Sequence, residues 1–348
     1  MNITKNTFGE LNSENVYSYS LENDHGMKVT CITLGCIITD IIVPDKNGNY
    51  ENVVLGFDDI DSYLNDSPYF GTIVGRVAGR IGNAEFELDG KQYSLPKNEN
   101  NNHLHGGPEA FDRKLWAAKE FQHDGEVGVE FSYLSPDGEN GYPGNLTVHV
   151  TYVLTNNNEL KISYSATSDK KTLVNLTNHT YFNLSGNLKD DILSHKLQLK
   201  SNQFLELGEN LLPTGEFLEV GNTPFDFRNS KAIKEAIEGN HQQIQIAGNG
   251  VDHPFLLDDH HNEEITLVEE QSGRKLTVET DEQSVVIYTS NMMDDSFVIR
   301  GTQARKYLGI CLETQGLPDS IHFPHFSPCV LDVNDEYKTS TTYSFSVL

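Results

Sequence analysis

Apolar and polar residues alternate along much of the chain, and this two-residue period is the dominant pattern in the sequence. In LTVHVTY, residues 146–152, Leu146 and Val148 fall on one face while Thr147 and His149 fall on the other. Successive side chains of a β-strand point to opposite sides of the sheet, so this segment is typical of a strand with one buried face. The same alternation recurs in three further segments, residues 127–133, 160–166 and 343–347.

Turn-forming residues separate the alternating segments. Asp89-Gly90 and Ser272-Gly273 each lie between two such segments, and an Asn-rich turn follows Thr155. Short turns of this kind connect antiparallel strands. The chain has neither a repeat of roughly 20–50 residues nor a Pro- or Ser-rich linker. We therefore expect a single domain, residues 1–348, formed by a large antiparallel β-sandwich.

Helical periodicity is scarce. SKAIKEAIEG, residues 230–239, offers Ser230 as an N-cap, Ile233 and Ile237 on one face, and Gly239 as a stop. DDIDSYLND, residues 58–66, predicts one or two more turns. The expected protein is all-β with very few short helices.

Net charge narrows the range of partners. The 348 residues carry a formal net charge of −26. Such a chain repels nucleic acid phosphates and anionic membranes, so we expect no nucleic-acid and no membrane partner. No stretch approaches the roughly 18 apolar residues of a membrane span. A neutral small molecule suits this charge best.

The expected compartment follows from the N-terminus and the cysteines. MNITKNTFGELN lacks the apolar run of a secretory signal. The cysteines are too sparse for a disulfide scaffold. They are Cys31, Cys36, Cys311 and Cys329. We expect a cytoplasmic protein with reduced thiols.

A pair of histidines interrupts the strand pattern in NNHLHGGPEAFDRKLW, residues 101–116. His103 and His105 face one way on an extended chain, and the Gly pair that follows permits close backbone approach. A His-x-His pair can form half of a metal site. Catalytic or substrate-binding use of one histidine, and a plain loop role, are the alternatives.

A polar cluster surrounds His179 in NLTNHTYFNLS, residues 175–185. Its Asn-x-Ser/Thr triplets begin at Asn175, Asn178 and Asn183, and would be glycan acceptors only in a secreted protein. So many donors and acceptors are costly to bury unless they are satisfied. Either a polyhydroxylated ligand satisfies them, or the segment is a self-contained Asn-rich turn.

Three further charged positions lie in apolar or Gly-rich surroundings. Glu313 ends the apolar run LGICLE, where desolvation would raise its pKa and make it a general base near neutral pH. A water-facing glutamate at a strand end is the alternative. Arg80 in GRVAGRIG and Asp252 in GVDHPF indicate charged partners or a ligand.

Taken together, these segments resemble the galactose mutarotase (aldose 1-epimerase) family. NNHLHGG, NLTNHTYFNL, VDHPF and CLETQGLPDS occur in the order and spacing of that family, and GTIVGRVAGRIG fits its arginine segment. The resemblance runs from about residue 10 to the C-terminus. It implies a large β-sandwich with an open sugar-binding cleft, and interconversion of the α and β anomers of D-galactose or D-glucose. It also implies no cofactor and no metal, with a monosaccharide as the partner of a monomer or homodimer.

The resemblance assigns a role to each matching position. His179 looks like the general acid, Glu313 looks like the general base, and His105 resembles the second active-site histidine. Arg80 and Asp252 look like substrate-binding groups. Because sugar hydroxyls both donate and accept, the Asn178 side chain is also expected to help hold the ring.

The implied reaction suits these side chains. Ring opening removes a proton from the C1 hydroxyl while the ring oxygen gains one, which a carboxylate and an imidazolium can do together. Unperturbed Glu titrates at about 4.3 and His at about 6.5. We therefore expect an ionised Glu313 and a modest upward shift in the pKa of His179.

Two departures leave the preferred sugar open. Gly79 stands where family members often have Asn, and Val286 where some have Gln. Two alternatives remain: a hexose-6-phosphate 1-epimerase-like enzyme, which would need more Arg or Lys than Arg76 and Arg80, and a non-catalytic sugar-binding protein of the same fold. A glycosidase would need two carboxylates flanking the bond.

Overall fold

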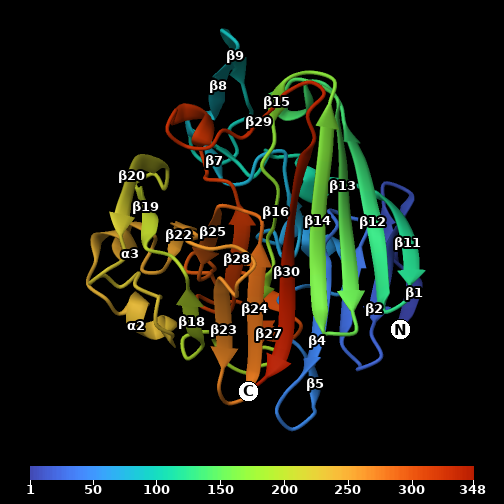
Figure 1. Ribbon diagram of the computed structural model, residues 1–348. Helices are drawn as coiled ribbons and strands as arrows, with labels where there is room; N and C mark the ends of the chain where they lie inside the picture. Colours follow the sequence, from blue (N-terminus) through green and yellow to red (C-terminus); the bar gives the residue numbers. More distant parts are fainter.

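The computed structural model describes residues 1–348, and its three large sheets are antiparallel throughout (Figure 1). The largest sheet has nine strands in the order β11-β12-β13-β14-β30-β24-β23-β18-β21. In that order the strands are Ala117–His123, Glu126–Ser135, Leu146–Thr155, Glu159–Ser168, Tyr337–Val347, Arg274–Thr280, Ile265–Glu269, Lys196–Leu199 and Lys231–Ala232. The C-terminal strand β30 therefore lies in the middle of this sheet.

Two further sheets complete the sandwich. A six-stranded sheet has the order β17-β28-β25-β22-β19-β20. Its strands are Tyr181–Phe182, Ile310–Gln315, Ser284–Tyr288, Asp252–Leu256, Gln203–Leu207 and Pro213–Glu219. A five-stranded sheet, β1 to β5, contains Asn2–Leu11, Glu14–Glu22, Lys28–Ile32, Ile38–Pro44 and Tyr50–Asn52.

Aromatic contacts join the sheets. The rings of Phe182 on β17 and Tyr343 on β30 are 5.3 Å apart, and those of Tyr19 on β2 and Phe131 on β12 are 6.3 Å apart. These side chains belong to one hydrophobic cluster of 54 buried residues, which draws on all three sheets. Burying a large apolar side chain contributes about 1.5–3 kcal/mol, so this shared core holds the sheets together.

The predicted strands and hairpins are confirmed. In β13 the alternating residues Leu146, Val148 and Val150 are buried, while Thr147 is exposed. The turn between β13 and β14 falls on the Asn-rich stretch, with Asn158 at φ 59°. The Asp89-Gly90 turn joins β8 (Glu85–Leu88) to β9 (Lys91–Ser94).

The helices are few and short, as expected, but one begins later than predicted. Helix α2 is Ile233–Ile237; Ser230 does not cap it, because Lys231 and Ala232 extend as strand β21 first. Helix α1, Ile60–Asn65, confirms the helical turns predicted for residues 58–66. Helix α3, Gln242–Ile246, was not predicted from the sequence. None of these helices has the length and apolar character needed to cross a membrane.

Short two-stranded ladders position the loops around the six-stranded sheet. Two of them bear on the site: β7 (Arg80–Ile81) with β10 (His103–Leu104), and β6 (Ile73–Val74) with β16 (Thr177–Asn178). The remaining pairs are β8 with β9, β15 (Thr172–Leu173) with β29 (Val330–Leu331), and β26 (Val298–Ile299) with β27 (Thr302–Gln303).

Candidate active site

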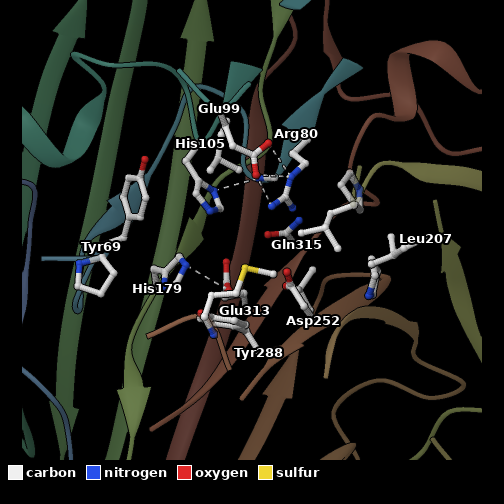
Figure 2. Close-up of a pocket in the computed structure, with 18 of the residues that line it drawn as sticks. Tyr69, Arg80, Glu99, His105, His179, Leu207, Asp252, Tyr288, Glu313 and Gln315 are labelled. Carbon is white, nitrogen blue, oxygen red and sulfur yellow. Dashed lines mark hydrogen bonds and ion pairs between the residues drawn. The ribbon is translucent and has the colours of Figure 1, made fainter. Parts of the chain in front are cut away.

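A pocket of about 220 Å³ lies on the outer face of the six-stranded sheet (Figure 2). The strand register explains which side chains form its floor. Tyr181, Cys311, Tyr288 and Asp252 are cross-strand neighbours in one row, and Glu313 pairs with Val286 in the next row. Side chains with this two-residue spacing share a face, so neighbouring strands deliver their polar groups to one hollow. The opposite face of β28 packs into the core through Leu312.

His179 and Glu313 meet inside this pocket. His179 lies between β16 and β17, where its backbone N–H donates to the Thr72 carbonyl at 2.9 Å. Its Nε2 is 3.4 Å from Oε1 of Glu313, and both side chains are about 95% buried (Figure 2). Two groups far apart in the chain are thus close enough to share one proton.

Burial shifts both members of this pair toward their neutral forms. Desolvation raises the pKa of Glu313 well above its usual range, and the nearby Asp252 carboxyl adds to the effect. Desolvation also lowers the pKa of His179 to about 4. The upward shift of the Glu313 pKa was expected. The expected upward shift of the His179 pKa is wrong, because loss of water around the buried ring disfavours the imidazolium.

Neighbouring side chains fix the orientation of the His179 ring. The Cys311 Sγ lies 3.5 Å from Nδ1, on the side of the ring away from Glu313. Tyr181 stacks on the imidazole with centroids 5.1 Å apart, and Tyr69 does so at 5.7 Å. A thiol behind Nδ1 is a weak donor and a weak acceptor, so it orients the ring without stabilising an imidazolium strongly.

His105 reaches the same pocket from the β7–β10 ladder. Its Nδ1 accepts a hydrogen bond from the Gly79 N–H at 3.2 Å, and its own backbone N–H donates to the Gly79 carbonyl at 3.0 Å. Nδ1 therefore carries no proton, and Nε2–H is left as a donor. Desolvation, followed by the proximity of His179 and Arg80, holds the pKa of His105 well below its usual range.

Arg80 and Asp252 also line the pocket, and Glu99 joins them. The Arg80 guanidinium donates to the Glu99 carboxylate through Nε at 3.0 Å and Nη2 at 2.7 Å. This bidentate pair fixes the Arg80 fork above the sheet. Desolvation raises the pKa of Asp252, and the charge of Arg80 partly offsets that shift. No sequence signal singled out Glu99.

The prediction that Asn178 binds the substrate is wrong, because the structure does not bring this side chain into the pocket. Adjacent residues of an extended chain point to opposite sides, so His179 and Asn178 diverge. The Asn178 amide donates to the Gly71 carbonyl at 3.0 Å, and its oxygen accepts from the Thr180 hydroxyl at 2.5 Å. Asn175 and Asn183 are buried too and bond to backbone groups, so the three triplets are internal scaffolding.

Two other charged residues of the sequence motifs are structural. Arg76 is buried and donates to main-chain carbonyls, among them those of Ser135, Pro143 and Gly144. His103 is buried against Tyr142, and its Nδ1 lies 2.7 Å from the Pro96 carbonyl oxygen. The two positions that depart from the family pattern, Gly79 and Val286, both line the pocket.

One cluster has the donor set for a divalent cation. Candidate ligand atoms of His105, His179 and Glu313 lie within 4.8 Å of one another. In His105 the Gly79 N–H occupies Nδ1, so Nε2 would have to give up its proton to bind a metal ion. Two imidazoles and a carboxylate suit a transition metal, so the cluster warrants a direct test with a chelator.

Comparison with known proteins identifies the class that this fold and site define. The family model described as "Aldose 1-epimerase" matches residues 17–344. Galactose mutarotase from Bos taurus is 41% identical, covering 100% of this chain and 99% of the relative, and that from Sus scrofa is 40% identical with the same coverage. A crystal structure of galactose 1-epimerase from Lactobacillus acidophilus superposes with a TM-score of 0.89 at 29% identity, covering 99% of both chains. The chain belongs to the aldose 1-epimerase family, and it is an isomerase of that class.

Proposed function

We propose that this aldose 1-epimerase interconverts the α and β anomers of D-galactose or D-glucose by acid–base opening and closure of the ring. The observation that carries the proposal is the 3.4 Å approach of His179 Nε2 to Glu313 Oε1 within a pocket of sugar size. Glu313 is the general base and His179 the general acid. His105 donates from Nε2–H, and Arg80 and Asp252 bind ring hydroxyls.

Each half of the reaction moves two protons. Glu313 removes the proton from the C1 hydroxyl, and the oxygen lone pair forms the aldehyde C=O. The C1–O5 bond breaks, its electron pair goes to O5, and O5 takes a proton from the His179 imidazolium. Rotation about C1–C2 presents the other aldehyde face. O5 then attacks C1 and returns its proton to His179, while Glu313 reprotonates the C1 oxygen.

The pKa shifts of the pair favour the opening step. Before opening, the pair is a carboxylate and an imidazolium; after opening, it is a carboxylic acid and a neutral imidazole. The raised pKa of Glu313 and the lowered pKa of His179 both favour the second arrangement. Starting from the carboxylate–imidazolium form, which these shifts make the less populated one, both transfers proceed with a larger driving force than in water, and general acid–base catalysis can supply roughly 10²–10⁴-fold for each. The pair holds one proton throughout and is restored at the end of the cycle.

The charges around the pocket support a neutral sugar over a phosphorylated one. Among its lining residues, Glu99, Asp252 and Glu313 are acidic, and Arg80 is the single Lys or Arg. Glu99 already occupies the Arg80 guanidinium. A phosphate needs several free donors or cations, so a hexose 6-phosphate is disfavoured. A sugar hydroxyl suits these groups because it both donates and accepts.

Free thiols support a cytoplasmic location as part of the proposal, since all four cysteines are unpaired. A monomer or a homodimer is proposed for the assembly.

Polarimetry of freshly dissolved α-D-galactose tests the activity directly. The purified protein should speed the rotation change over the buffer rate, and should do so equally after dialysis against a chelator. Parallel runs with glucose, xylose and arabinose rank the substrates, and galactose 6-phosphate should be turned over poorly. A rotation rate indistinguishable from buffer would refute the proposal, and loss of activity on chelation would assign a metal to the His105–His179–Glu313 cluster.

A further inference from the structure

Gln315 is a pocket residue that the proposed reaction does not use. It lies two residues after Glu313 on β28, so both side chains project from the same face of the sheet. Gln315 is fully buried and lines the same pocket as Glu313. Figure 2 shows its amide between Arg80 and Asp252. Its Oε1 has no hydrogen-bond partner within the protein.

The orientation of this amide follows from its neighbour. Gln315 Nε2 donates to the Gly316 carbonyl at 3.3 Å. A carbonyl can only accept, so the amide nitrogen must face it, and Oε1 is the amide atom left without a partner. Asn175 holds the Gly316 residue on both sides, accepting from its N–H at 2.9 Å and donating to its carbonyl at 3.1 Å. The free group offered to a ligand is therefore an acceptor.

A buried acceptor without a donor is unfavourable, and a ligand hydroxyl would relieve it. Along a strand, residues i and i+2 are separated by about 6.6 Å. If the proposed function places the C1 hydroxyl at Glu313, a side chain at this distance from Glu313 lies toward the opposite edge of a pyranose ring, where the C3 and C4 hydroxyls are.

We propose that Gln315 is a sugar-binding residue that sets specificity by accepting a hydrogen bond from the C3 or C4 hydroxyl. This inference rests on the proposed function, which places C1 at Glu313. The contact discriminates strongly, because a sugar without that hydroxyl leaves the buried Oε1 unpaired.

Deoxy sugars combined with a Gln315 variant test a direct contact. The wild type and Gln315→Met are compared on D-glucose, 3-deoxy-D-glucose and 4-deoxy-D-glucose. For wild type, kcat/KM should fall about 10-fold on whichever deoxy sugar lacks the bonding hydroxyl. Gln315→Met should lose a similar factor on D-glucose but less than about twofold on that same deoxy sugar.

The control is Gln283→Met, at a partly buried glutamine outside this pocket, which should leave all three values unchanged. Gln315→Leu replaces the Met variant if that one does not fold. Equal losses on all three sugars, or no loss on D-glucose, would overturn the inference. Calorimetric titration with the same sugars gives the same comparison in Kd without turnover. An inert wild type would thus count against the acid–base chemistry, while the Kd values still decide the role of Gln315.

Discussion

The pH dependence of the reaction follows from single residues. In the proposed mechanism the pair must hold one proton, so activity should fall when His179 and Glu313 are both protonated and again when neither is. Because burial lowers the pKa of His179 to about 4, the doubly protonated state forms only below that pH. Because burial raises the pKa of Glu313, the last proton leaves only well above the usual glutamate range.

We therefore predict a bell-shaped profile of kcat/KM with its acid limb centred close to pH 4. Stopped-flow polarimetry at constant ionic strength, with the buffer-catalysed rate subtracted, measures it. The two limbs belong to the coupled pair, not to either residue alone. An acid limb near 6.5, the value of an unperturbed imidazole, would show that the buried pair does not control the rate.

At the scale of one residue, the sequence indicated which residues line the pocket better than it indicated how buried each of them is. His179, Glu313, His105, Arg80 and Asp252 were all singled out, and all line one pocket. The direction of the His179 pKa shift could not be foreseen, because it depends on burial by segments distant in sequence. Assigning Asn178 to the pocket ignored the alternation that turns it away from its neighbour His179.

At the scale of an element, strand β28 organises the site. Cys311, Glu313 and Gln315 project from one face of it. They place a thiol beside the His179 ring, and a carboxyl and an amide in the pocket. Period-two reading around Glu313 would have predicted all three together. Glu99 could not be found that way, because its role depends on a loop that meets Arg80 through tertiary contact.

The Asn175 side chain holds the end of β28 through two hydrogen bonds to the backbone of Gly316. Replacing Asn175 by Ala leaves the Gly316 N–H unpaired and removes one donor to its carbonyl. We predict a free energy of unfolding lower by about 1–3 kcal/mol, measured by urea denaturation. The exposed Asn240→Ala is the control and should change it by less than about 0.5 kcal/mol. A similarly small effect for Asn175→Ala would mean that these two hydrogen bonds do not stabilise the strand.

At the scale of the whole molecule, the alternating pattern predicted the all-β sandwich because it records which face of each strand is buried. It could not predict how three sheets share a core, since contacts such as Phe182 with Tyr343 join residues far apart in the chain. The start of helix α2 could not be predicted for the same reason. The helical motif was recognised, but its first residues pair with the nine-stranded sheet as strand β21.

The shared core predicts that residues 1–348 unfold as one domain. Trp116, the single tryptophan, is buried against Tyr133 of the nine-stranded sheet. Of the proposed catalytic pair, Glu313 lies on the six-stranded sheet instead, and His179 lies beside it. Heating should therefore shift the tryptophan emission to longer wavelength and abolish anomerisation over the same temperature range. Loss of activity well before the fluorescence change would indicate that the sheets unfold separately.

The most direct test of the central claim compares α-D-galactose anomerisation by wild type, Glu313→Gln, His179→Asn and the double variant. Each single variant should keep the wild-type thermal transition and lose roughly 10²–10⁴-fold in rate. The double variant should be little slower than the less active of the two single variants, because the two groups serve one pair of linked proton transfers. A single variant that retains most of the wild-type rate, or losses that multiply fully in the double variant, would contradict a proton-sharing His179–Glu313 pair.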